Sequence, residues 1–207
     1  MNIVIASKNK KKIEEIKRIF EKECRQDQSR GAELFHIKIF TLNDFPECPD
    51  IIEDGETFEE NAIKKALSVA KYTDMTALAD DSGLEVYALN RAPGVHSARY
   101  AGEDTDDKRN IEKLLYEMYS YAGDKRKARF VCSVVLVLPD GKTNTFHGYI
   151  EGRIGTESKG CGGFGYDPVF YPEGYTKTFS EMDEDEKDAI SHRGMALNKA
   201  YQFLKGI

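Results

Sequence analysis

Two long strand-like runs joined by a tight turn constrain the fold of this chain more than any other feature. Phe130–Leu138 and Lys142–Ile154 have the composition of β-strands, and Pro139-Asp-Gly141 between them is a typical hairpin turn. Strands connected in this way pair antiparallel. The sequence therefore predicts a sheet that contains at least one hairpin.

The first 24 residues predict a strand, a turn and a helix. Asn2–Ala6 is a short apolar run typical of a buried strand. Ile13, Ile16 and Phe20 then recur at helical spacing between Lys10 and about Cys24. Helices mixed with strands and a hairpin predict an α/β fold with a mixed β-sheet flanked by helices.

The other elements follow from the same two periodicities. The expected strands are Phe35–Phe40, Thr76–Ala79 and Leu84–Leu89, and the expected helices run from Thr57 to about Tyr72, from Thr105 to about Tyr121 and from Ser191 to Leu204. We expect loops at residues 25–33 and 80–83, and a capping box in which Thr57 caps its helix and Glu60 reaches back. No repeat or linker marks a boundary, so residues 1–207 are expected to form a single domain.

Composition limits the compartment and the partners. A net charge of −6 argues against general nucleic-acid binding, and no apolar run approaches the ~20 residues that span a membrane. The four cysteines are scattered without a CxxC pair, and Cys132 lies in an apolar run that suggests a core position. The short apolar N-terminus precedes its lysines, the reverse of a signal peptide. We therefore expect a cytoplasmic protein that binds neither membrane nor nucleic acid.

The segment Gly162–Pro168 combines three glycines, two aromatic rings and an acid in seven residues. Glycine lets the backbone approach a ligand closely. Phe164 and Tyr166 offer faces for stacking, and Asp167 offers a hydrogen-bond acceptor, so the segment suits a planar heterocycle such as a nucleobase. The alternative is a tight surface turn that buries two aromatics.

A basic cluster lies between the first strand and the first helix: Ser7, Lys8, Asn9, Lys10, Lys11 and Lys12. Lysines at a helix N-terminus oppose the helix dipole, and a bound phosphate would reverse that penalty. The cluster is not a Walker loop, because it lacks the glycines of that motif. The alternative is a solvated basic helix start, and the spacing alone favours that interpretation.

Acidic residues gather in two places, Glu53–Glu60 and Asp80-Asp81-Ser82. Hard carboxylate oxygens suit Mg²⁺, which takes one or two carboxylates together with waters and substrate phosphates. Capping of the helix that begins at Thr57 explains part of the Glu53–Glu60 group. Asp80 and Asp81 are adjacent at the end of an apolar run, and they would repel one another without a cation nearby.

Cations recur near the C-terminus at Lys187, His192 and Arg193. Ser191 is a plausible N-cap, which would place His192 and Arg193 in the first helical turn, where the dipole disfavours cations. Lys10–Lys12 likewise place cations in the first turn of a helix. The recurrence suggests an anionic or carbonyl-bearing ligand shared by the two sites.

Taken together, these motifs resemble those of the inosine/xanthosine triphosphate pyrophosphatase family, in the family's order from about residue 2 to 205. The matching segments are Ser7-x-Asn9-x-x-Lys12-x-x-Glu15, Glu53-x-Gly55-x-Thr57-Phe58-x-x-Asn61-Ala62, Ala79-Asp80-Asp81-Ser82-Gly83-Leu84, Ala92-Pro93-Gly94-Val95-x-Ser97-Ala98-Arg99-Tyr100, Gly163–Pro168, Glu186-Lys187 and Ser191-His192-Arg193-Gly194. Lys8 departs from the pattern, because many relatives have glycine there.

The resemblance implies a homodimer whose elongated mixed sheet forms two lobes with a central cleft. It implies that Glu53 and Asp81 bind Mg²⁺, with Asp81 as general base and Ser82 in contact with substrate. The implied triphosphate site is Ser7, Lys8, Asn9, Lys10, Lys11 and Lys12, and the implied base pocket is Phe164, Gly165, Tyr166, Asp167, Lys187, His192 and Arg193. Whether Asp80 or Asp81 is the dominant base stays open.

The function implied is Mg²⁺-dependent hydrolysis of the purine nucleoside triphosphates ITP, dITP and XTP to the monophosphate and pyrophosphate, which cleanses the nucleotide pool. One alternative is a pyrophosphatase of the related Maf type, with a preference for modified pyrimidine or guanine nucleotides. The other is a nucleotide-sensing module without turnover, against which the presence of both Glu53 and Asp81 argues.

Overall fold

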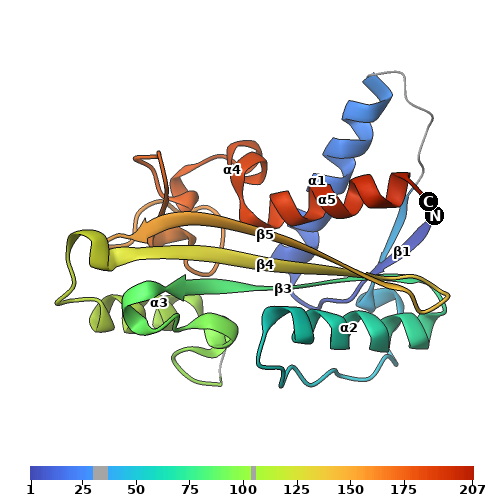
Figure 1. Ribbon diagram of the computed structural model, residues 1–207, viewed down its shortest axis with the longest axis horizontal. Coiled ribbons are helices and arrows are strands. Elements are labelled where there is room, and N and C mark those ends of the chain that lie inside the picture. Colours follow the sequence, from blue (N-terminus) through green and yellow to red (C-terminus); the bar gives the residue numbers. More distant parts are fainter. Residues whose placement is uncertain (30–36, 104–105) are drawn as a thin grey trace. The chain divides into compact units, whose positions relative to one another are not determined.

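The computed structural model describes residues 1–29, 37–103 and 106–207. Six strands in this part of the chain form one sheet in the order β2-β1-β3-β4-β5-β6 (Figure 1). They are β1 (Asn2–Ile5), β2 (Lys38–Thr41), β3 (Thr76–Val86), β4 (Lys127–Val137), β5 (Thr143–Ile154) and β6 (Phe170–Pro172). β1 pairs in parallel with β2 and β3, whereas β5 and β6 pair antiparallel. The predicted mixed α/β sheet is confirmed.

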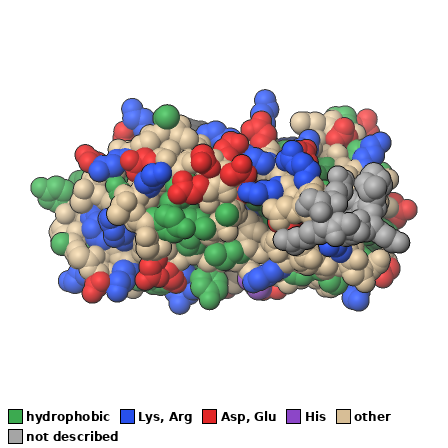
Figure 2. All heavy atoms as spheres, turned by 90° about the horizontal axis from the view of Figure 1, so that it is seen from above, with side chains coloured by type: hydrophobic (Ala, Val, Ile, Leu, Met, Phe, Trp, Pro, Cys, Tyr) green, Lys and Arg blue, Asp and Glu red, His purple; other side chains and the backbone are tan. Residues whose placement is uncertain are grey.

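The helices are α1 (Lys10–Ser29), α2 (Phe58–Thr73), α3 (Asp107–Glu117), α4 (Glu184–Ile190) and α5 (His192–Lys205). Short 3₁₀ helices include Leu42–Asp44, Tyr87–Leu89, Gly94–Arg99, Gly123–Arg126, Asp167–Val169 and Phe179–Glu181. None of the described helices is both long and apolar enough to cross a membrane. Figure 2 shows acidic and basic side chains interspersed over one face of the protein.

The chain divides into two compact units. Unit 1 consists of residues 1–81, 132–148 and 193–207, and unit 2 consists of residues 82–131 and 149–192. The single domain, the lobes and the cleft expected from the sequence stay predictions.

In unit 1, helices cover both faces of the sheet (Figure 1). Ile5 of β1 and Leu78 of β3 belong to the apolar cluster formed with α1 and α5, whereas Val4 and Ala79 belong to the cluster formed with α2. Successive residues of a strand point to opposite faces. This alternation decides where the acids that follow Ala79 project.

In unit 2, the core forms around aromatic rings. The ring of Phe130 lies 4.6 Å from that of Phe170, and it also lies 4.6 Å from the imidazole of His192, with 6° between the two planes. Leu114 of α3 and Met118, the residue that follows this helix, belong to the same cluster. His192 therefore begins α5 as part of this core.

The predicted hairpin and the helix cap have a clear local basis. The N–H of Leu138 donates to the carbonyl of Lys142 over 2.9 Å, and Gly141 adopts a φ of 83° that glycine tolerates. Thr57 caps α2 by accepting from the Glu60 N–H over 3.1 Å. The second predicted bond of the capping box, from the Thr57 N–H to the Glu60 carboxylate, is wrong. The Glu60 carboxylate accepts from the Glu56 N–H instead.

Other boundaries differ from the prediction. The loop expected at residues 80–83 is part of the continuous strand β3, because cations compensate both acids inside the sheet, while Tyr87–Leu89 is a 3₁₀ helix. α1 continues to Ser29 through most of the loop expected at residues 25–33, whose last four residues lie outside the described ranges. β2 begins at Lys38, and residues 35–36 of the expected strand also lie outside.

Two short elements were not anticipated, and one helix is shorter than expected. β6 has three residues and α4 has seven, too few for a clear periodicity. α3 spans Asp107–Glu117, within the range expected from Thr105 to Tyr121. Its start is fixed by the Asp106 carboxylate, which accepts from the N–H groups of Lys108 and Arg109.

Candidate active site

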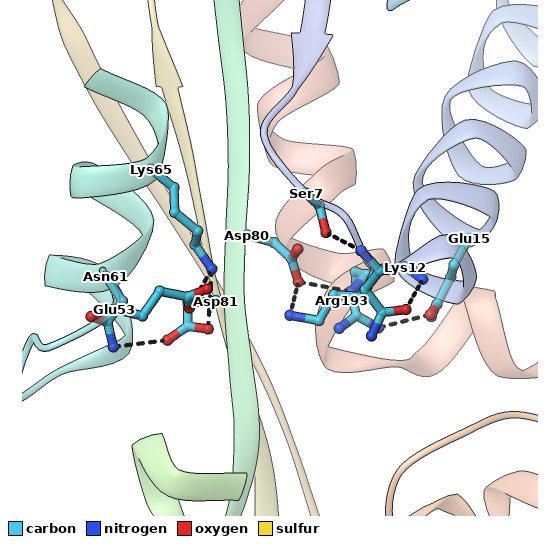
Figure 3. A network of polar contacts seen from close by, with 10 residues as sticks. Ser7, Lys12, Glu15, Glu53, Asn61, Lys65, Asp80, Asp81 and Arg193 are labelled. Carbon is cyan, nitrogen blue, oxygen red and sulfur yellow. Dashed lines mark hydrogen bonds and ion pairs between the residues drawn. The ribbon is translucent and has the colours of Figure 1, made fainter. Parts of the chain in front are cut away.

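Asp80 and Asp81 project to opposite faces of β3, because they are consecutive residues of one strand. Figure 3 shows two separate polar networks, one on each side of that strand. The network around Asp81 includes side chains of α2, and the network around Asp80 includes side chains of α1 and α5. Both acids belong to unit 1.

The Asp81 network centres on a lysine ammonium. Lys65 Nζ lies 2.9 Å from Glu53 Oε2 and 3.3 Å from Asp81 Oδ1. Asn61, one helical turn before Lys65 on α2, donates from Nδ2 to Asp81 Oδ2 over 3.3 Å. α2 thus supplies a cation and an amide that together fix both oxygens of the Asp81 carboxylate.

Burial and charge act in opposition on this group. Burial raises the pKa of Asp81 above its ordinary value, although Lys65 and Lys12 pull it down. Burial alone would lower the pKa of Lys65, but Asp81, Asp80 and Glu53 together raise it, so the ammonium stays protonated. A carboxylate with a raised pKa is a better proton acceptor than an exposed aspartate.

The residues at this point fit a divalent cation. Glu53 and Asp81 already converge on one positive centre, and carboxylate oxygens are the ligands that Mg²⁺ prefers. Among the described residues no group of three or more His, Cys, Asp or Glu side chains could hold a metal. A cation bound here would therefore take its remaining ligands from water or from a phosphorylated ligand.

Asp80 is locked into ion pairs on the other face. Arg193 Nε lies 3.1 Å from Asp80 Oδ2, and Arg193 Nη1 lies 2.7 Å from Glu15 Oε2. Lys12 Nζ lies 3.3 Å from the same Asp80 oxygen. All of these side chains are buried except the half-buried Lys12.

The charges of this network hold Asp80 ionised. Burial would raise the pKa of Asp80, but Lys12, Arg193 and Lys65 hold it well below its usual range. A carboxylate this acidic is a poor base. Of the two acids left open by the sequence, Asp81 is the one whose pKa is raised, which favours it as a proton acceptor.

The basic cluster forms a capped helix start. Asn9 Oδ1 accepts from the Lys12 N–H, and Ser7 Oγ accepts from the Asn9 N–H, each over 3.2 Å. Lys8 is exposed and pairs with Asp50. Lys10 and Lys11 are also exposed at the start of α1. The 20-residue helix α1 thus begins with a concentration of cations at its positive end.

The glycine-rich segment of unit 2 is organised by Asp167. Its Oδ2 accepts from the Phe164 N–H over 2.8 Å and from Lys187 Nζ over 2.7 Å. Gly163 has a φ of 70°, and a Cβ there would lie 2.1 Å from the same oxygen. Asp167 therefore accepts hydrogen bonds from its own loop and from Lys187.

The two aromatics of this segment have different environments. Tyr166 is buried in the core of unit 2, and its hydroxyl donates to the Ser97 carbonyl over 2.9 Å. Phe164 is half-buried, and Lys187 Nζ lies 5.0 Å from its ring centroid. Phe164 is therefore the ring of the two that retains exposed area for stacking.

The remaining predicted site residues belong partly to unit 1 and partly to unit 2. Gly165 donates its N–H to Asp107 over 2.8 Å, and Ser82 is half-buried in β3. Lys187 and His192 belong to unit 2. Arg193, predicted in the base pocket, belongs to unit 1 and binds two buried carboxylates there.

Sequence reasoning did not single out Lys65 or assign a role to Glu15. The sequence pattern around each of them could have indicated a buried charge. Lys65 lies on the α2 face that buries Ala62 and Ala66, and Glu15 lies beside the buried Ile16 of α1. A charged residue on a buried helix face needs a partner, because an unpaired buried charge is costly.

The mixed sheet, the cationic helix start and the carboxylate pair define an α/β protein with a charged candidate site around β3. The comparisons give the family. The chain belongs to the Ham1 family, whose model matches residues 3–203.

Individual relatives agree over nearly the whole chain. It is 46% identical over 204 residues to a dITP/XTP pyrophosphatase of Desulforamulus reducens, covering 99% of this chain and 96% of the relative. It is 46% identical to one from Bacillus anthracis, covering 95% and 93%. Among solved structures, it is similar to the Ham1 protein of Staphylococcus aureus, with TM-score 0.84, 41% identity and coverage of 100% and 99%. A HAM1 protein from Coxiella burnetii has TM-score 0.85, 40% identity and complete coverage of both chains.

Proposed function

We propose that this protein hydrolyses the noncanonical purine nucleoside triphosphates ITP, dITP and XTP to the monophosphate and pyrophosphate. The observation that carries the proposal is the convergence of Glu53 and Asp81 on one buried cationic centre. The family membership and the names of the relatives, dITP/XTP pyrophosphatases, support the same reaction and substrate class.

Residues of α1, α2 and β3, together with Glu53, would perform the chemistry. The cations at the start of α1, with Lys12 nearest the carboxylates, would bind the triphosphate. Asp81 would accept the proton of the water that attacks the α-phosphorus, and Asn61 and Lys65 would hold its carboxylate in position. Glu53 and Asp81 would hold Mg²⁺, which supplies charge neutralisation on the phosphates.

The glycine-rich segment and Lys187 would select the base. Phe164 would stack on the purine, and Lys187 would donate to the oxygen at C6, which inosine and xanthine share. Adenine presents a donor at that position and would leave buried groups unpaired, at a cost of about 1–3 kcal/mol for each group. His192 is a second candidate donor, and Ser82 is a further candidate contact.

The resemblance also supports a homodimer and a cytoplasmic location. Light scattering coupled to gel filtration tests the dimer, and a mass of one chain at micromolar concentration would remove it from the proposal.

Product analysis tests the reaction. Incubation with ITP and Mg²⁺ is expected to release IMP and pyrophosphate in equal amounts, as measured by ³¹P NMR. Excess EDTA is expected to stop the hydrolysis. Release of inorganic phosphate and IDP would contradict the proposed bond cleavage. Binding of ITP without any product would favour the sensing module, and turnover only of modified pyrimidine or guanine nucleotides would favour the Maf-type alternative.

A further inference from the structure

A polar cavity lies in unit 2, and none of its lining residues is assigned to the proposed reaction. Its volume is about 260 Å³. The lining side chains include the cations Arg126, Arg153 and Lys159, together with Glu157, Thr156 and Tyr171. Three cations and one carboxylate around one cavity leave an excess of positive charge.

Arg126 is buried with carbonyls as its partners. It donates to the carbonyls of Ile154, Met118, Tyr121 and Gly155, and it forms no ion pair among the described residues. These four bonds leave one of the five guanidinium donors. Carbonyl dipoles solvate the group without cancelling its charge, and a buried charge is stable only when it is compensated.

Arg153 adds a second guanidinium without a carboxylate. Its Cζ lies 4.2 Å from the centroid of the Tyr171 ring, and over the described residues it has no ion pair. Burial and the nearby charge of Arg153 together lower the pKa of Arg126. Two guanidiniums that repel one another therefore line the same cavity, and the aromatic ring holds one of them in place.

Lys159 brings its own counter-charge. Its Nζ lies 3.6 Å from Glu157 Oε1, so the one carboxylate on the cavity wall is matched to this lysine. The charges of Arg126 and Arg153 remain uncompensated by the lining side chains. The cavity thus has the charge, the hydrogen-bond donors and the space for a small anion.

We propose that this cavity binds free inorganic phosphate, with the guanidinium of Arg153 as the principal ligand. A planar guanidinium matches two phosphate oxygens at once, and the Thr156 hydroxyl can donate a further bond. Ligand pockets usually have volumes of about 300–1,000 Å³, so a cavity of this size suits an inorganic anion better than a whole nucleotide.

The site is tested by following the backbone amides of Gly155, Thr156 and Glu157 in ¹H–¹⁵N spectra of the full chain during titration with inorganic phosphate. Saturable shifts at these amides are expected. Titration with sodium chloride at matched ionic strength controls for screening, and titration with IMP distinguishes a nucleotide phosphate from the free anion. The amides report this cavity separately from phosphate bound at the start of α1.

Variants test the ligand. Arg153→Gln is expected to weaken phosphate binding at least ~10-fold, as expected for loss of a charged hydrogen-bonding group. Arg153→Lys keeps the charge but not the fork, and should give an intermediate affinity. Lys125→Ala removes an exposed cation of the same unit outside the cavity, and should bind phosphate like the wild type.

Four results would overturn the proposal. These are the absence of saturable shifts with phosphate, equal shifts with chloride, shifts with IMP but not with phosphate, and unchanged phosphate affinity in both Arg153 variants.

Discussion

At the scale of single residues, the two neighbouring acids of β3 have different surroundings because consecutive side chains point to opposite faces of the strand. Asp80 is surrounded by cations that keep it ionised, whereas Asp81 shares Lys65 with Glu53 and has a raised pKa. An adjacent pair in the sequence therefore faces two different polar networks in the fold.

Asp81→Asn is expected to reduce turnover of ITP by ~10²–10⁴-fold, because it removes a proton acceptor and a cation ligand. Nucleotide binding should persist in part, since the lysines and Phe164 remain. Steady-state rates and equilibrium binding of IMP measure the two effects. The control Asp54→Asn removes an exposed carboxylate paired with Lys64 and should keep normal turnover. Near-normal activity in Asp81→Asn would remove Asp81 from the mechanism.

Arg193→Ala is expected to destabilise the fold by roughly 3–5 kcal/mol, because it leaves the buried carboxylates of Glu15 and Asp80 without their guanidinium. Urea unfolding measures the loss. Arg91→Ala is the matched control: Arg91 pairs with Glu85 at 3.7 Å from an exposed position, and such pairs contribute at most ~1 kcal/mol. Equal destabilisation by the two variants would show that the buried network contributes little.

At the scale of elements, the loop Gly162–Pro168 depends on close approach between Gly163 and Asp167. Gly163→Ala introduces a Cβ 2.1 Å from Asp167 Oδ2, so the carboxylate that binds Lys187 must move. Gly165→Ala also has a positive φ of 59°, but its Cβ meets nothing within 4 Å. We expect Gly163→Ala to cost about 1–3 kcal/mol more than Gly165→Ala in unfolding experiments.

The same comparison extends to substrate. The KM for ITP should rise more in Gly163→Ala than in Gly165→Ala, because Lys187 loses its partner in the first variant. Indistinguishable stability and KM in the two variants would refute the role given to Asp167 in shaping this loop.

The turn Phe179–Glu181 should respond to acid. The Glu181 carboxylate accepts from the Thr178 N–H over 2.8 Å, and this bond lowers the pKa of Glu181. A carboxylate with a lowered pKa stabilises the fold above its ordinary pKa, and the contribution disappears as the pH falls through the folded value. The stability difference between wild type and Glu181→Gln should therefore shrink from about pH 6 to about pH 3.

Urea unfolding at the two pH values measures this difference, and Glu173→Gln, an exposed glutamate nearby in sequence, is the control that should show no such change. A gap between wild type and Glu181→Gln that stays constant or widens in acid would contradict the assignment.

Local sequence patterns predicted the helices and strands well where the periodic pattern extended over many residues. α2 and the β4–β5 hairpin lie within a few residues of their predicted ranges. β3 was predicted as two strands, because paired aspartates rarely occur inside a sheet and their compensating cations come from residues distant in sequence. β6 and α4 are too short to show a period.

At the scale of the whole molecule, the collinear motifs predicted the residues of the candidate site, and their roles toward substrate stay predictions. It could not show that Arg193 binds Asp80 and Glu15, because Glu15 is 178 positions away in the chain. It also could not show that Tyr166 is buried in the core. Side-chain direction and burial depend on tertiary packing, which residue types and spacing do not specify.

We propose that Asp81 acts on the attacking water and that the Phe164–Asp167 segment selects the base. Variants of Asp81 should therefore lower kcat for every substrate alike. Variants of the Phe164–Asp167 segment should instead change the preference among bases.

The most direct test of the proposed function is the ratio of kcat/KM between nucleotides, measured as pyrophosphate release from ITP, dITP, XTP, ATP and GTP under one set of conditions with Mg²⁺. A polar pocket that rejects a substrate by leaving its groups unpaired discriminates strongly, so kcat/KM for ITP and XTP should exceed that for ATP and GTP by at least ~10²-fold. Comparable kcat/KM for ATP and ITP would contradict both the base pocket and the proposed function.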